Sequence, residues 1–440
     1  MIKRKRFISL LPGLVVLLAL LAASCAPAVA PTATPTKAPA AAPTAASKTE
    51  PTKPAGTTAT TPTAATSKPA AKLKGTEVKI GFMGPKTGPV AAWGIENEEV
   101  LKMAEKEIND SGGIGGLPVK FLFFDTQAKP DEAVSLTRKL LSEDKVLMLL
   151  GPYLSGEASV AFPIAVSMKA PIFSCCSAAP GVSEKSRPWA FRLPQPDDKG
   201  LVAMIKKYVA DNNIKKAVTI GDQKDAASKI ASTQYIPNAL KEAGVQILNG
   251  NEPIGYNTGD TSFAAQVTRI KELNPEAMFM YALPAEGGAF IKEVRRQGLK
   301  QPMVTGSSLV AVQFLDAGGD AVEGTIMNAV WDPMHPSSKK FVDGFKKLYN
   351  KEPTMAGAYT YDAIYIAKQV IETSGATNDP AELAKDWEKI RDGLQNIKFD
   401  GATGKSSFDK NGDGVHAVYE AVVKGGKIVV NYNKVVLDAQ

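Results

Sequence analysis

Residues 77–84 read EVKIGFMG and residues 119–125 read VKFLFFD, two short and mostly apolar runs that set the pattern for most of the chain. Between them, residues 95–108 carry apolar side chains at helical spacing: Val100, Met103, Ala104 and Ile108. A strand, a helix and a second strand in this order predict two parallel strands joined by a helix that crosses one face of the sheet. The fold is therefore expected to be of the α/β class.

The same alternation continues to residue 306. Strands are expected at 146–151, 171–174, 217–221, 245–250, 277–281 and 302–306, and helices at 131–142, 156–169, 228–243, 262–273 and 288–297. Residues 73–440 form too long a segment to share one hydrophobic core, so two lobes are expected. The sequence thus predicts two doubly wound lobes, each a parallel sheet with helices on both faces.

The N-terminus has the features of an export signal. Basic residues at positions 3–6 precede an apolar run over residues 7–22, and small residues lead to Cys25. The LAASC box at 21–25 resembles that of bacterial lipoproteins, whose cysteine is diacylated and becomes the mature N-terminus. Residues 1–25 are then a lipoprotein signal, and the exported protein is anchored by lipid to the outer face of the cytoplasmic membrane or lies in the periplasm. Cleavage after the A-x-A site at 28–30 is the alternative, and it releases a soluble protein.

The segment before residue 73 also carries the excess positive charge. Residues 26–72 are mostly Ala, Pro and Thr with scattered Lys, a composition that predicts a disordered linker. Of the net charge of +7, the signal contributes four charges, and the five lysines of the linker less Glu50 contribute another four, which leaves about −1 for residues 73–440. The folded part therefore lacks the basic field that nucleic-acid binding requires.

Ligands of doubly wound sheets bind beyond the carboxyl ends of the strands, so the loops there are the expected site. In the first lobe these loops read GPKTGPVAAWG (84–94), GPYLSG (151–156) and SCCSAAP (174–180). In the second lobe they read GDQKDAAS (221–228), YALPAEGG (281–288) and TGSSLV (305–310). The helices that follow direct backbone N–H groups at this edge, which favours an anionic or carbonyl group on the ligand.

Five segments in order carry a family resemblance: IGFMGPKTGPVAAWG, EKEINDSGGIGGLPVKFLFFDTQAKPDEAV, KLLSEDKVLMLLGPYLSG, FRLPQPDD and FDKNGDG. Together they resemble the periplasmic branched-chain amino-acid (leucine, isoleucine and valine) binding proteins of ABC importers. The resemblance runs from about residue 77 to the C-terminus. It implies a type I clamshell that is not an enzyme, binds a small molecule between its lobes and delivers it to a membrane permease.

The same resemblance implies three crossings between the lobes. They are expected near 194–196, 324–330 and 416–419. The N-terminal lobe is then residues 73–195 plus 326–415, and the C-terminal lobe is residues 196–325 plus 416–440. We expect a monomer that closes around its ligand. A lipoprotein that senses the ligand and presents its bound state to a signalling partner is the alternative function.

Ligand contacts follow from the resemblance position by position. Trp93 falls where a ring packs on the ligand's side chain, and Tyr153 is expected to add to this surface. Ser155 matches a serine that hydrogen-bonds the ligand carboxylate, although a helix N-cap is another use of such a residue. The loop SCCSAAP matches one whose backbone receives the carboxylate and the amine, with Cys176 and Ala178 at its contact positions and Ser177 between them.

The chain departs from the family where the ligand's amine is held. Ala178 replaces a threonine, and Ser307 replaces the glutamate that pairs with the ammonium group. Ala226 and Leu283 replace two tyrosines, and Asp225 remains as an acceptor beside the first. Because an ammonium group buried without a carboxylate is costly, leucine, isoleucine and valine are not expected to bind tightly. The expected ligand is a carboxylate or amide on an apolar or aromatic body, packed on Trp93, Tyr153 and Leu283.

Other motifs give no cofactor, metal site or catalytic centre. DKNGDGVHAVYE (409–420) fits a calcium-loop pattern, but strand-like sequence flanks it, and a tight turn between strands is favoured. GATGKSS (401–407) and GGIGG (112–116) lack the strand and helix context of nucleotide-binding loops. The chain has only two histidines, His335 and His416, which are expected to be solvated or to line the hinge.

Cys175 and Cys176 leave two alternatives open. In an exported protein adjacent cysteines can form a vicinal disulfide, whose ring strains the peptide bond between them. The other reading is a reduced pair of small residues that line the ligand loop. A nucleophile or a metal site lacks the partner residues that either would need.

Overall fold

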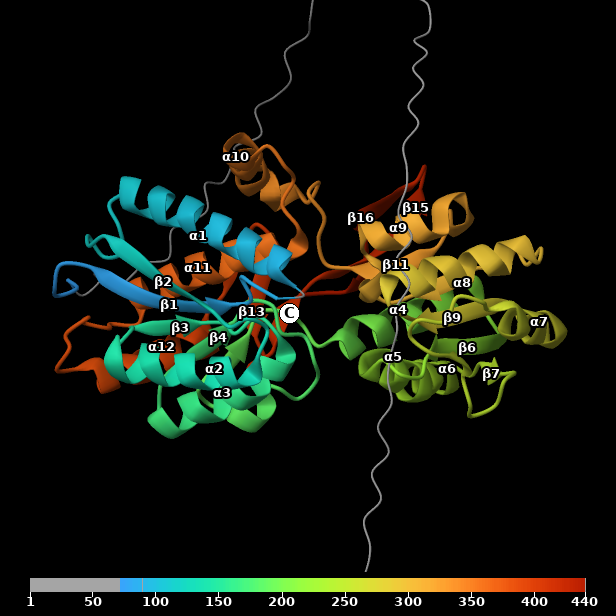
Figure 1. Ribbon diagram of the computed structural model, residues 1–440, viewed down its shortest axis with the longest axis horizontal. Coiled ribbons are helices and arrows are strands. Elements are labelled where there is room, and N and C mark those ends of the chain that lie inside the picture. The colour runs from blue at the N-terminus through green and yellow to red at the C-terminus, as the bar shows by residue number, and fades with distance from the viewer. Residues whose placement is uncertain (1–71, 89, 440) are drawn as a thin grey trace, which may run out of the picture. The chain divides into compact units, whose positions relative to one another are not determined.

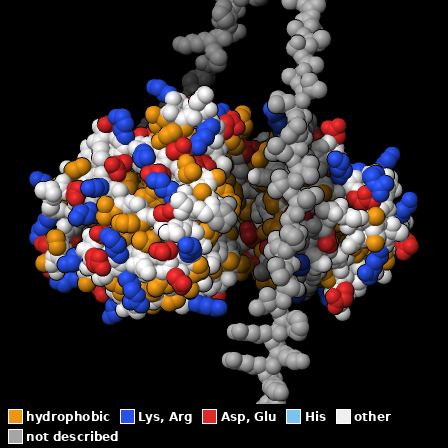
Figure 2. Space-filling view, in the orientation of Figure 1, with side chains coloured by type: hydrophobic (Ala, Val, Ile, Leu, Met, Phe, Trp, Pro, Cys, Tyr) orange, Lys and Arg blue, Asp and Glu red, His pale blue; other side chains and the backbone are white. Residues whose placement is uncertain are grey.

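The structure is a computed structural model that describes residues 72–439 apart from Pro89. The predicted export signal, Cys25 and the linker to residue 71 lie outside the described residues. Within the described part of the chain, no helix combines the length and the apolar character that crossing a membrane requires. Figure 2 shows acidic and basic side chains interspersed on the visible face, without a large area of one sign.

Five parallel strands form the sheet of the N-terminal lobe, in the order β2-β1-β3-β4-β5. Their bounds are β1 Val78–Gly84, β2 Val119–Asp125, β3 Met148–Leu150, β4 Ile172–Ser174 and β5 Ala190–Arg192. Helices cover both faces (Figure 1), with α1 packed against α11 and α2 packed against α3. The helices are α1 Ala91–Asp110, α2 Pro130–Arg138, α3 Ser155–Met168, α10 Lys339–Tyr349, α11 Met355–Thr373 and α12 Leu383–Asn396.

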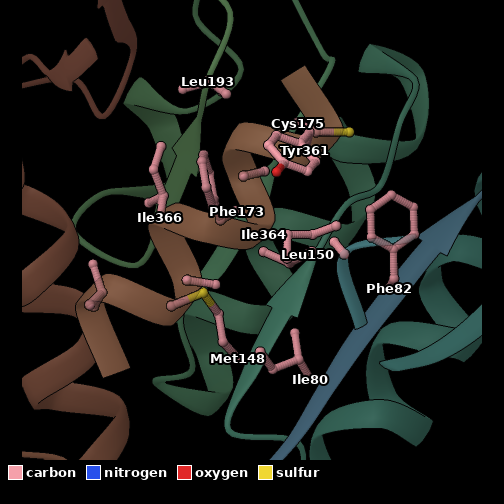
Figure 3. Close-up of a cluster of buried hydrophobic side chains, with 14 of the residues drawn as sticks. Ile80, Phe82, Met148, Leu150, Phe173, Cys175, Leu193, Tyr361, Ile364 and Ile366 are labelled. Carbon is pink, nitrogen blue, oxygen red and sulfur yellow. The ribbon is translucent and has the colours of Figure 1, made fainter. Parts of the chain in front are cut away.

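Alternate residues of these strands enter two different hydrophobic cores. Met148 and Leu150 of β3 join the core under α1 and α11, whereas Leu149 joins the core under α2 and α3. Figure 3 shows part of the first core, including Ile80, Phe173 and Cys175. Because both faces of the sheet are buried, its strands are continuous apolar runs in the sequence. This is why the strands could be predicted from the sequence.

The sheet of the C-terminal lobe is mixed, not wholly parallel as expected. Its order is β16-β15-β11-β10-β9-β6-β7, and β8 also pairs with β6. The parallel strands are β6 Lys216–Asp222, β7 Gln246–Ile247, β8 Ile254–Tyr256, β9 Ala277–Tyr281, β10 Met303–Thr305 and β11 Ile326–Ala329. The hairpin of β15 (Val418–Lys424) and β16 (Lys427–Leu437) adds antiparallel strands at the β11 edge, because a two-residue turn joins them without a crossover helix.

Helices also cover both faces of this second sheet (Figure 1). They are α4 Asp197–Asn212, α5 Ala226–Ile230, α6 Ile236–Glu242, α7 Ala264–Leu273, α8 Pro284–Arg296 and α9 Val312–Gly318. Met278 and Met280 of β9 enter the core shared with α7 and α8, and Phe279 enters the core shared with α4 and α6. The two lobes therefore share one architecture, in which helices cover both faces of a central sheet.

The chain passes between the two sheets after β5, after β11 and through β14 (Gly414–His416), which leads to β15. β14 belongs to a small antiparallel sheet with β12 (Phe399–Gly401) and β13 (Gly404–Phe408). His416 is fully buried here, with its Nε2 2.7 Å from the Leu193 carbonyl oxygen, and burial lowers its pKa to about 4. It lines the hinge and is not solvated.

A buried ion pair joins the first and third crossings. Arg192 ends β5 and is fully buried, and its Nε lies 2.6 Å from Oδ1 of Asp413, which precedes β14. The same carboxylate accepts a hydrogen bond from Ser183, and Arg192 also donates to the Ala179 carbonyl of the 174–180 loop. The ion pair therefore connects the hinge to the predicted ligand loop.

We expect Asp413→Asn to lower the free energy of unfolding by about 3–5 kcal/mol, because it leaves the Arg192 guanidinium buried without its counter-charge. Urea denaturation at neutral pH measures this change. The matched control is Asp110→Asn, which makes the same charge change in the exposed Lys106–Asp110 pair and should cost less than about 1 kcal/mol. Equal effects of the two substitutions would contradict a structural role for the buried pair.

Candidate functional site

Two adjoining hollows lie between the lobes, where the carboxyl ends of the strands meet. One has a volume of about 480 Å³ and the other about 120 Å³. Tyr153, Cys176, Ala178 and Asp197 line both hollows, so the two form one cleft. The larger volume falls within the range that small-molecule sites occupy.

Trp93 and Tyr153 form an aromatic shelf on the N-terminal lobe. Trp93 lies in the first turn of α1, and Tyr153 lies in the loop after β3. Their rings stack with centroids 5.2 Å apart and planes inclined by 19°. Trp93 keeps 42% of its surface exposed, whereas Tyr153 is buried. An exposed ring supported from below can pack on the apolar body of a ligand.

Ser155 and the 174–180 loop together form a cradle for a ligand oxygen. Ser155 is the first residue of α3, not its N-cap, and its Oγ accepts a hydrogen bond of 3.1 Å from the Ala179 N–H. Because the oxygen is used as an acceptor, the hydroxyl proton remains available to a ligand. The first turn of α3 adds the positive end of a helix. These groups suit a carboxylate.

The two cysteines of the loop face different surroundings. Cys175 is fully buried in the core of the N-terminal lobe (Figure 3), whereas Cys176 lines the cleft. Both are free thiols, and their sulfur atoms lie 2.7 Å apart. Burial and the neighbouring Cys175 thiol raise the pKa of Cys176 well above its usual value. The pair therefore acts as small uncharged residues in the loop wall.

Asp197 faces this cradle from the C-terminal lobe. It is the first residue of α4, directly after the first crossing, and the Tyr281 hydroxyl donates to its Oδ2 at 3.3 Å. The nearby Ser307 hydroxyl favours the ionised form of Asp197 and so acts to lower its pKa. Desolvation in the cleft raises the pKa of Asp197 to about 6, against the opposing effects of Tyr281 and Arg192. The cleft thus contains an acid that titrates close to neutral pH.

Six of the ten residues predicted from the sequence line the cleft: Trp93, Tyr153, Ser155, Cys176, Ala178 and Ser307. The structure does not place Ser177, Asp225 or Leu283 along either hollow. Asp225 instead caps α5, where its carboxylate accepts hydrogen bonds from the N–H and hydroxyl of Ser228. Leu283 occupies the N-cap position of α8, and Ala226 is the first residue of α5.

Sequence reasoning missed the acid of the cleft. It named no carboxylate among the residues that line the cleft, whereas Asp197 lines both hollows. The signal was present in FRLPQPDD (191–198), since an aspartate after a proline-rich crossing is typical of a helix start. Tyr281 and Asn328, which also line the cleft, were missed as well.

The calcium-like pattern at 409–420 folds as a tight turn between β13 and β14, as predicted. Its carboxylates are engaged by protein groups: Asp409 accepts the N–H groups of Asn411 and Asp413, and Glu420 in β15 pairs with Lys434 at 2.6 Å. Among residues 72–439 without Pro89, the His, Cys, Asp and Glu side chains form no cluster of three that could hold a metal ion.

Comparisons with known proteins agree with this fold. The family model described as "Periplasmic binding protein" matches residues 77–427. The Leu/Ile/Val-binding protein homolog 1 of Brucella suis is 27% identical over 342 residues, which cover 77% of this chain and 87% of that protein.

Two solved structures are also similar. A branched-chain amino acid transporter substrate binding protein of Streptococcus pneumoniae, in complex with isoleucine, is 25% identical with a TM-score of 0.64 and covers 81% of this chain and 100% of its own. A solute binding protein of an ABC transporter from Rhodopseudomonas palustris, in complex with 3,4-dihydroxy benzoic acid, is 23% identical with a TM-score of 0.67. It covers 82% of this chain and 98% of its own, and at this identity it shows the fold alone.

We expect two reactive thiols per chain in a Cys25→Ser variant that is unfolded without reductant, because Cys175 and Cys176 are both free. In the folded protein neither should react quickly with a disulfide reagent at neutral pH, since one is buried and the pKa of the other is raised. Counting thiols before and after reduction checks this. A count that rises from zero to two on reduction would show a vicinal disulfide instead.

Proposed function

Because the chain belongs to the periplasmic binding protein family, we propose that it is the substrate-binding lipoprotein of an ABC importer. It captures a small molecule with a carboxylate or amide group on an apolar or aromatic body, holds it between the two lobes, and delivers it to a membrane permease. Its relatives are binding proteins for amino acids, and three solved structures of similar fold are in complex with aromatic acids.

The observation that carries this proposal is the geometry of Ser155. Its hydroxyl is oriented by the Ala179 N–H, which leaves one proton to donate toward the cleft. A hydrogen bond to a charged acceptor is stronger than one between neutral groups, so a ligand carboxylate is the best match for this donor. The positive end of α3 favours the same charge.

The rest of the larger hollow is mostly apolar and suits the body of such a ligand. The aromatic shelf closes one side, and Leu201, Ala227, Ile230 and Tyr235 line the side that belongs to the C-terminal lobe. A ligand that contacts both lobes stabilises the closed arrangement, because only there are both sets of contacts made. This closed, loaded form is the one that we expect a permease to receive.

The anchor is a separate part of the proposal, and it rests on the sequence before residue 72. The LAASC box supplies Cys25 for diacylation, and two acyl chains hold a protein at a membrane stably where one does not. The Ala/Pro/Thr-rich stretch at 26–72 then links the anchor to the binding domain.

For the anchor, we expect the full chain to incorporate labelled palmitate when it is expressed in a bacterium with lipoprotein processing, and a Cys25→Ser variant to lose the label. Gel autoradiography of the purified protein measures this. Ser24→Thr is a suitable control, because it keeps the cysteine and alters its neighbour only slightly. A mature N-terminus at residue 31 without label would instead show ordinary cleavage after the 28–30 site.

For the cleft, we expect Ser155→Ala to weaken the binding of carboxylates by about tenfold or more, because a hydrogen bond to a charged group contributes about 1.5–3 kcal/mol. Calorimetric titration uses four probes: phenylalanine, leucine and their amine-free counterparts 3-phenylpropanoate and 4-methylpentanoate. Ser159→Ala, an exposed serine one turn along α3, is the matched control. Equal affinities for the wild-type chain and Ser155→Ala would contradict the carboxylate cradle.

A further inference from the structure

The thiols of Cys175 and Cys176 have no part in the proposed function of the cleft. Both are free, and their sulfur atoms lie 2.7 Å apart. Cys175 is buried in the core of the N-terminal lobe (Figure 3), whereas Cys176 lines both hollows. An atom that enters the cleft and bonds to the sulfur of Cys176 therefore lies beside a second sulfur.

The backbone of the loop holds the two thiols side by side. Ser174, the last residue of β4, donates from its hydroxyl to the Pro152 carbonyl at 2.6 Å. The same hydroxyl oxygen accepts the N–H groups of Cys176 at 3.3 Å and of Ser177 at 3.0 Å. Ser174 and Cys175 are fully buried, so this turn has little room to rearrange. A ligand that bonds both sulfurs therefore loses little free energy in bringing them together.

The surroundings of the pair disfavour a thiolate. Burial and the neighbouring Cys175 thiol raise the pKa of Cys176 well above its usual value. Among the described residues that line the two hollows, none is Lys, Arg or His, so a thiolate there would lack a counter-charge. A nucleophile or a soft cation needs thiolates, and neither suits this pair. The other titratable groups around Cys176 are Tyr153 after β3, Glu96 on α1, Tyr359 on α11 and Asp197 on α4.

Trivalent arsenic suits two neutral thiols. Arsenous acid and the hydrated aryl arsenicals are uncharged near neutral pH, and each carries at least two arsenic–hydroxyl groups. A thiol replaces one of these groups: an arsenic–sulfur bond forms, the S–H bond breaks, and its proton leaves with the hydroxide as water. Two such exchanges release two waters, no free proton and no electrons, so arsenic stays trivalent and the product stays neutral. Sulfur is the preferred ligand of such a soft element.

The aromatic shelf indicates which arsenicals the cleft prefers. Trp93, Tyr153 and Cys176 line the same hollow of about 480 Å³, and Trp93 keeps 42% of its surface exposed. An arsenic atom held by the two sulfurs can place an apolar, flat substituent on this exposed ring. Arsenous acid has no such substituent, so an aryl arsenical should bind more tightly.

We propose that Cys175 and Cys176 form a chelating site for trivalent arsenicals, with a preference for those that carry an aryl substituent. The site lies in the wall of the cleft, so its occupation also obstructs the larger hollow. The chelation goes beyond the proposed function and does not depend on it, whereas competition with a carboxylate ligand rests on that function.

The test uses the full chain with Cys25→Ser, reduced by a phosphine that is then removed, so that Cys175 and Cys176 are its only cysteines. Phenylarsine oxide is the probe, tryptophan fluorescence follows its binding, and intact-mass spectrometry counts arsenic atoms per chain. We expect one arsenic per chain and the loss of both reactive thiols. The dithiol 2,3-dimercaptopropanol should remove the arsenic, and a monothiol at the same thiol concentration should not, because two bonds must be replaced.

Two variants test the pair itself. Cys176→Ser removes one sulfur ligand at nearly constant size and should weaken binding by about 100-fold or more, because the second bond of a chelate forms within the molecule. Adding Ser159→Cys, at an exposed position on α3, restores the thiol count without the adjacency and should not restore binding. Trp93→Leu should weaken the binding of phenylarsine oxide and leave that of arsenous acid unchanged. Thermal denaturation of each variant checks that it is folded.

The outcomes separate this inference from the proposed function. Because the exchange releases no proton, the affinity for phenylarsine oxide should change by less than about threefold between about pH 6 and pH 8. A rise of about 100-fold over this range would show thiolate ligands and overturn the inference, as would a folded chain that retains no arsenic or equal affinities of the parent chain and Cys176→Ser. Failure of the arsenic-free chain to bind 3-phenylpropanoate would contradict the proposed function alone.

Discussion

The ion pair between Arg192 and Asp413 is the interaction on which the arrangement of the cleft depends. It is buried at the point where the chain first leaves the N-terminal lobe, and it holds together segments more than two hundred residues apart in sequence. Through the Ala179 carbonyl, Arg192 also fixes the loop that carries Cys176 and Ala178. Space here is tight, since a Cβ at Gly414 would lie 1.6 Å from the Leu193 carbonyl oxygen. The hinge and the ligand loop are thus one packed unit.

From this unit the two lobes contribute different chemistry to the cleft. The N-terminal lobe supplies hydrogen-bond donors around Ser155 and the stacked rings of Trp93 and Tyr153. The C-terminal lobe supplies acceptors, above all Asp197.

Much of the fold could be predicted from the sequence because buried parallel strands leave a strong pattern. The expected strands at 119–125 and 277–281 match β2 and β9 to the residue. Residues 416–440 were expected in the C-terminal lobe, but their antiparallel addition to its sheet was not, because β15 and β16 alternate between buried and partly exposed residues and β11, the partner of β15, lies about ninety residues earlier.

The site was predicted less completely, for physical reasons that differ by residue. Trp93 and Ser155 follow strand ends within one lobe, so local sequence places them. Asp225 also follows a strand end, but it lies along neither hollow and uses its carboxylate to cap α5. Asp197 could not be placed, because its entry into the cleft depends on how the chain turns after Pro196 and on Tyr281, which lies more than eighty residues later.

The position of Asp197 directly after the first crossing has a consequence for the order of events during capture. A point close to a rotation axis moves little when two bodies rotate about it, whereas Ile230 and Tyr235, a helix further along the chain, travel on a longer lever arm. A contact made at Asp197 therefore changes less during such a rotation than a contact made at Ile230 or Tyr235.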